Sequence, residues 1–117
     1  MELKLIDQTD AFTLVALLGR LDTPGVDQIE LRFNATLVNA RRPAIVDLSA
    51  VEFLSSMGVR MLLAAAKVLN RSGARLVLVA PRPLVEGALR HSAIDELIPV
   101  CADLAAAREA CLGTTPA

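Results

Sequence analysis

The chain has 117 residues, of which 54% are hydrophobic and only 3% aromatic, so we expect one domain whose core is built from Leu, Val, Ile and Ala. Its formal net charge of −1 gives no excess of positive charge for binding nucleic acid. No apolar run approaches the roughly 18 residues that span a membrane, and the first residues lack the apolar stretch of a signal peptide. We therefore expect a cytoplasmic protein that neither binds nucleic acid nor inserts into a membrane.

The first third of the chain predicts a hairpin followed by a helix. Apolar and polar residues alternate at 3–5, and residues 12–18 form a stronger strand a short turn later, as in a β-hairpin. Apolar residues then recur at helical spacing over 24–38. Asp22 or Thr23 can cap this helix, and its first position holds a proline, whose missing N–H has no partner to lose there.

The rest of the chain alternates strands with helices. We expect strands at 44–48, 76–79 and 97–100, and helices at 56–72, 84–91 and 104–112. This alternation after a hairpin favours an α/β fold with a mixed, mostly parallel sheet of about five strands and about four helices. We expect residues 1–112 to form the domain and residues 113–117 a flexible tail.

Few residues suggest catalysis or a cofactor. Cys101 and Cys111 have no ligand partners and no secretion context, so we expect small buried residues rather than a disulfide or a metal site. Ser56 and His91 lack the Gly-x-Ser-x-Gly elbow of a hydrolase, and there is no glycine-rich phosphate loop. We therefore expect a protein that is not an enzyme and needs no cofactor.

Two serines, Ser55 and Ser56, stand where the central strand passes into the helix at 56–72. A hydroxyl at this place accepts a hydrogen bond from an early helical N–H, so either serine is a candidate cap. A helix N-terminus also carries partial positive charge and free N–H groups, which suit a phosphate. Phosphorylation there would add about −1.5 to −2 charges to the surface.

The helix at 56–72 has a second apolar stripe besides its core face. At about 100° per residue, one side carries Val59, Leu62, Leu63, Ala66 and Leu69. The other side carries Met57, Met61, Ala64 and Val68. An apolar stripe that points away from the core is typical of a docking surface, and methionine suits an adaptable one. The alternative is that a neighbouring helix covers the stripe.

Three stretches of the chain resemble STAS domains, the module shared by bacterial anti-sigma factor antagonists and the cytoplasmic tails of sulphate transporters. They are GRLDTPG, AIVDLSAVEFLSSMGVRMLLAAAKVLNRSGARLVLV and HSAIDELIPVCADLAAA, and the resemblance covers nearly the whole chain. In the family the helix start reads Asp-Ser-Ser-Gly or Asp-Ser-Thr-Gly, with the phosphoacceptor directly after the Asp. By position, the resemblance implies that Ser56 is the phosphoacceptor, with Ser55 as the alternative. It also implies that Gly58 lets a partner approach and that Asp22 lies near the phosphorylated hydroxyl.

The resemblance implies an anti-sigma factor antagonist. Its partner would be an anti-sigma factor with a GHKL-type ATP-binding fold that doubles as a serine kinase, captured by the unphosphorylated chain and released on phosphorylation. The expected contact residues are Asp22, Ser55, Met57, Gly58, Arg60, Met61 and Ala64.

Two residues depart from the family pattern, which commonly has Asp at the place of Ser55 and a second hydroxyl residue at the place of Met57. These departures favour an alternative, a constitutive docking subunit of a lipid-transporting ABC complex or of a stressosome-like assembly. A further alternative is a weak homodimer formed through the apolar stripe.

Overall fold

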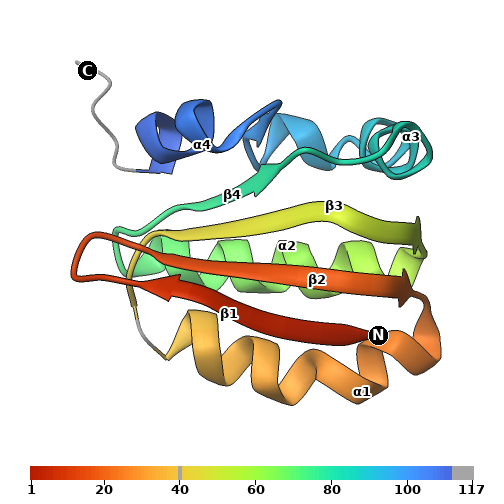
Figure 1. Cartoon of the computed structure of the whole chain (residues 1–117), viewed down its shortest axis with the longest axis horizontal. Helices are drawn as coiled ribbons and strands as arrows, with labels where there is room; N and C mark the ends of the chain where they lie inside the picture. Colours follow the sequence, from red (N-terminus) through yellow and green to blue (C-terminus); the bar gives the residue numbers. More distant parts are fainter. Residues whose placement is uncertain (40, 112–117) are drawn as a thin grey trace.

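The computed structural model describes residues 1–39 and 41–111, which form a five-stranded sheet with helices on both faces (Figure 1). The strand order is β1-β2-β3-β4-β5; β1 and β2 form an antiparallel hairpin, and all other neighbours are parallel. The predicted α/β fold with a mixed, mostly parallel sheet is confirmed. In chain order the elements are β1 (Glu2–Gln8), β2 (Thr13–Leu21), α1 (Thr23–Phe33), η1 (Asn34–Val38), β3 (Ala44–Leu54), α2 (Ser56–Arg71), β4 (Leu76–Val79), α3 (Pro83–His91), η2 (Ile94–Glu96), β5 (Val100–Cys101) and α4 (Leu104–Cys111).

The longest strand, β3, ends at Leu54 and not at residue 48 as expected. Its pairing with β4 stops at Asp47, but its pairing with β2 continues up to the pair Leu21–Leu54. The carboxyl ends of β2 and β3 therefore lie side by side, beyond the end of β4. This arrangement decides where the helices that follow these strands begin.

Two apolar layers hold the helices on the sheet. The larger core lies between the sheet and the helices α1 and α2, and Val85 and Leu89 of α3 also belong to it. The smaller core packs α4 on the opposite face, where Ala107 and Cys111 contact the sheet. Burial raises the pKa of the Cys111 thiol to about 11. As expected, Cys111 is a buried apolar residue; Cys101 is half-buried, and both are free thiols.

The ends of two predicted elements differ from the structure. Residues 34–38 form the π-helical turn η1 instead of continuing α1. The sequence predicts the last strand at 97–100, but β5 holds only Val100 and Cys101. Leu97 is 62% exposed, and Pro99 has no N–H to donate to a neighbouring strand. The tail predicted at 113–117 lies outside the described residues. No helix among the described residues is long and apolar enough to cross a membrane.

Candidate functional site

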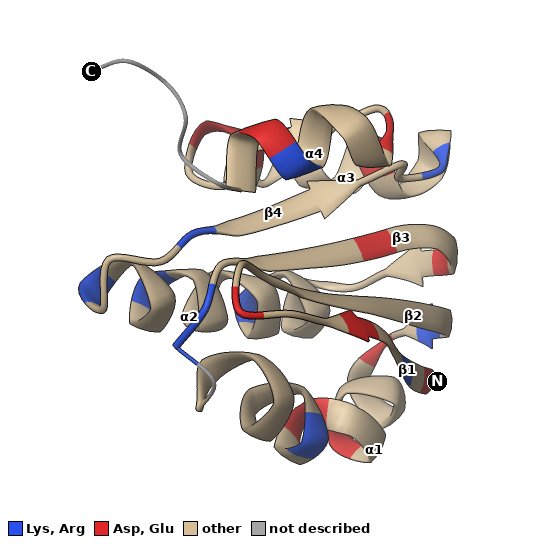
Figure 2. Ribbon diagram, turned by 60° about the vertical axis from the view of Figure 1, so that its left-hand side comes forward, with Lys and Arg blue, Asp and Glu red and all other residues tan. Residues whose placement is uncertain are grey.

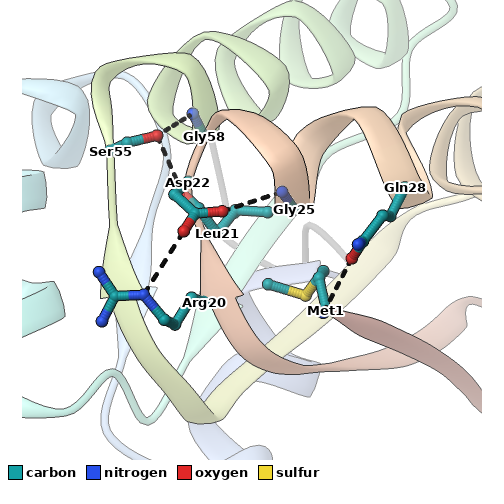
Figure 3. Close-up of polar contacts among 8 residues, drawn as sticks. All are labelled: Met1, Arg20, Leu21, Asp22, Gly25, Gln28, Ser55 and Gly58. Carbon is teal, nitrogen blue, oxygen red and sulfur yellow. Dashed lines mark hydrogen bonds and ion pairs between the residues drawn. The ribbon is translucent and has the colours of Figure 1, made fainter.

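The helices α1 and α2 both begin at the paired ends of β2 and β3 (Figure 3). Asp22 follows the last residue of β2 and caps α1, and Ser55 follows the last residue of β3 and caps α2. Because the two parallel strands end at the same pair, Leu21 and Leu54, two helix N-termini lie at the same edge of the sheet. Because each N-terminus carries a partial positive charge, this edge is a favourable place for negative charge.

The hydroxyl of Ser55 is used twice within the protein. It accepts a hydrogen bond from the Gly58 N–H at 3.2 Å and donates one to the Leu21 carbonyl oxygen at 2.9 Å (Figure 3). The Ser55 N–H donates to the same carbonyl at 3.0 Å. Ser55 is therefore the structural cap that joins α2 to the end of β2.

The carboxylate of Asp22 is also fixed by two contacts. It accepts a hydrogen bond from the Gly25 N–H at 2.9 Å, and its second oxygen lies 3.4 Å from Arg20 Nε. The Gly25 hydrogen bond, followed by Arg20, holds the pKa of Asp22 below its usual value. The Arg20 guanidinium in turn lies 4.6 Å from the centroid of the Phe53 ring. Sequence reasoning missed Arg20, although it stands two residues before Asp22 on extended backbone, a spacing that puts both side chains on the same side.

Gly58 is required by packing inside the chain. A Cβ atom at Gly58 would lie 2.8 Å from the Leu21 carbonyl oxygen and 2.8 Å from Leu54 Cδ1. Gly25 has the same role for α1, because a Cβ there would collide with the carbonyl of Arg20. Both glycines let a helix start directly against the strand ends. The approach of a partner at Gly58 stays a prediction, and Gly58 itself is buried.

Ser56, the other serine of the pair, is exposed and is the first residue of α2. Among the residues that the structure describes, its hydroxyl has no hydrogen-bond partner. Arg60 follows one turn later and is exposed, as is Ala64; Met57 is 39% exposed. The predicted phosphoacceptor is therefore accessible, and three predicted contact residues share its surface.

The expectation that Met61 belongs to this surface is wrong. Met61 is 2% exposed and lies in the larger core, because α1 packs against that flank of α2. The buried face of α2 is turned relative to the expected one, so that Val59 and Leu63 are only partly buried. Its buried residues are Gly58, Met61, Leu62, Ala65, Ala66 and Leu69. The outward face keeps Met57, Ala64 and Val68 but loses the second methionine.

Comparison with known proteins agrees with this architecture. The model of the STAS domain family matches residues 4–107. BtrV of Bordetella bronchiseptica, which carries the name of an anti-sigma factor antagonist, is 28% identical over 95 residues, covering 81% of this chain and 82% of that protein.

Solved structures show the same fold. An anti-sigma factor antagonist from Mycobacterium paratuberculosis superposes with a TM-score of 0.81 at 25% identity, covering 94% of each chain. The anti-sigma factor antagonist SpoIIAA in its unphosphorylated form gives a TM-score of 0.76 at 22% identity, covering 93% of this chain and 95% of SpoIIAA. With the family model matching most of its length, the chain belongs to the STAS domain family.

Proposed function

We propose that the protein is a cytoplasmic anti-sigma factor antagonist whose binding is switched off by phosphorylation of Ser56. Its partner is an anti-sigma factor with a GHKL-type ATP-binding fold that also acts as the serine kinase. The kinase supplies the nucleotide and the transferred phosphoryl group, so the chain itself needs neither catalytic residues nor a cofactor.

The observation that carries this proposal is the difference between the two serines. The Ser55 hydroxyl both donates and accepts within the protein, whereas Ser56 presents an exposed hydroxyl at a helix N-terminus. A kinase can reach Ser56 without disturbing the cap of α2. The names of BtrV and SpoIIAA support the same class of function, and SpoIIAA has been solved in both unphosphorylated and phosphorylated forms.

Phosphorylation would change the surface of α2 in two ways. The phosphate adds about −1.5 to −2 charges beside the exposed Met57, which disfavours an apolar contact there. It also stands four residues before Arg60 on the same helix, a spacing at which opposite charges attract. The phosphate thus competes with the partner for the Arg60 guanidinium.

The test is phosphoryl transfer followed by capture. The protein is incubated with ATP and each purified GHKL-type anti-sigma kinase of its host, and intact mass is measured. We expect a gain of one phosphoryl group in the wild type, none in Ser56→Ala, and full labelling in Ser92→Ala, which removes another exposed serine hydroxyl. In a binding assay, Ser56→Asp should weaken capture and Ser56→Ala should keep it.

Two results would contradict the proposal. Labelling that persists in Ser56→Ala would move the modified site to Ser55. A protein that no kinase labels, but that co-purifies with a permease or its ATPase, would be a constitutive docking subunit instead.

A further inference from the structure

The exposed face of α2 carries charge of one sign only. Arg60, Lys67 and Arg71 lie within about 40° of one line along the helix at 100° per residue. The helix contains no Asp or Glu, and Figure 2 shows blue segments but no red along α2, whereas α1 carries both colours. Met57, Ala64 and Val68 run beside this line, so the face is both basic and apolar.

These cations have no partner within the described part of the chain. The ion pairs there are Lys4–Glu2, Arg20–Asp22 and Arg90–Glu86, and none involves α2. Arg41, just before β3, is likewise without an ion pair or side-chain hydrogen bond among the described residues. Surface cations that are left unpaired along one line are available to carboxylates of another molecule.

The line of cations ends at an open hollow of about 520 Å³. Arg41 and Arg71 border the hollow, and Val38 and the 40% exposed Val68 supply apolar walls. Asn39 and Ser72 complete its lining. Such a hollow suits an apolar side chain that has a carboxylate beside it.

We propose that this face, from Met57 to the hollow, receives an acidic amphipathic helix of the anti-sigma factor. This inference rests on the proposed function and adds the chemistry of the partner surface: carboxylates opposite Arg60, Lys67 and Arg71, and one apolar side chain in the hollow. The 16 residues of α2 span about 24 Å, enough for a partner helix of several turns.

Two other occupants fit the face less well. A polyanion would not need the interleaved apolar residues, and the net charge of −1 does not draw one in. A symmetric dimer through α2 would place each basic line against its own copy, because a two-fold contact pairs the same surface with itself. A partner with acidic and apolar groups satisfies both components of the face.

The two ends of α2 should act independently. Ser56 and Arg71 are 15 residues apart, about 22 Å along the helix, which exceeds the screening length of about 8–10 Å at physiological salt. A phosphate at Ser56 therefore does not neutralise the hollow. We expect cations at the far end to govern encounter with the partner whether or not Ser56 is modified.

The test measures association and dissociation rates with the purified anti-sigma kinase that captures the wild type, between about 50 and 500 mM salt. Lys67→Glu should lower the association rate constant about tenfold at low salt, and the difference should vanish at high salt. The substitution is safe for the helix because it creates a Glu four residues before Arg71. Val68→Ala should instead raise the dissociation rate constant about tenfold.

Each variant has a matched control on α1. Arg32→Glu makes the same charge change at an exposed cation of α1 that has no ion pair among the described residues. Arg32 follows one turn after Gln28, whose side chain accepts a hydrogen bond from the Met1 amino group. Leu31→Ala truncates a residue that is 86% exposed. Both controls should keep wild-type rates. A Lys67→Glu protein with wild-type rates, or an equal effect of Arg32→Glu, would overturn the inference while capture controlled by Ser56 still stood. If no anti-sigma kinase bound the wild type, the proposed function itself would fail.

Discussion

The roles assigned to the two serines predict opposite effects on stability and on modification. Ser55→Ala removes the cap of α2 and so leaves the buried Gly58 N–H without its acceptor, a single loss that lies at the upper end of the range for helix caps, about 2 kcal/mol. The Leu21 carbonyl still accepts from the Ser55 N–H, so it adds little. We expect the free energy of unfolding to fall by about 2 kcal/mol. For 117 residues this corresponds to a drop in Tm of about 8 °C.

Ser56→Ala should change the free energy of unfolding by less than about 0.5 kcal/mol, because the exposed hydroxyl has no partner among the described residues. Urea unfolding followed by far-UV circular dichroism measures both variants, since the chain has no Trp or Tyr to report by fluorescence. Ser55→Thr, which keeps the hydroxyl, serves as the control and should stay close to the wild type. Equal losses in the two alanine variants, or a larger loss for Ser56→Ala, would refute the assignment.

Three further outcomes follow from burial and close packing. Gly58→Ala should lower the free energy of unfolding by about 1–3 kcal/mol, because the added Cβ would collide with the ends of β2 and β3. Gly87→Ala on α3, where an added Cβ has nothing within 4 Å, should raise it by about 0.5–1 kcal/mol. Thermal melts that show equal effects would contradict this. Met61→Glu should abolish soluble folded protein, and Met57→Glu should not; circular dichroism of both decides. Cys111, with a pKa of about 11, should react with a thiol reagent at pH 8 only after unfolding, and rapid labelling of the native protein would disprove its burial. Because burial raises this pKa from 9.0 to about 11, the stability that the protonated thiol contributes should be lost as the pH rises from 9 to 11.

Local signals predicted most of the fold. The cap at Asp22 and the α2 end before Gly73, with its positive φ of 81°, depend on short stretches of sequence. The difference between Ser55 and Ser56 cannot be predicted from a short stretch, because the Ser55 hydroxyl donates to the Leu21 carbonyl, 34 residues earlier. Only the pairing of β2 with β3 brings it there.

The position of Met61 shows a second limit of sequence periodicity. The spacing of apolar residues gives their angles around α2, but it does not say which flank the next helix covers. α1 lies against the Met61 flank, so the buried arc is shifted from the expected one. The hollow at the end of α2 could not be predicted from helical periodicity either. It is lined by residues of η1 and α2, which are distant in the sequence.

The carbonyl oxygen of Leu21 accepts hydrogen bonds from both the amide and the hydroxyl of Ser55. One backbone oxygen therefore links the beginning of α2 to the residue that precedes the cap of α1. A molecule that tilts either helix must strain this joint, and the two helices should respond together. Slow hydrogen exchange at the Ser55 amide would then show that its hydrogen bond to Leu21 is intact. Faster exchange would show that a bound partner or an added phosphate has weakened it.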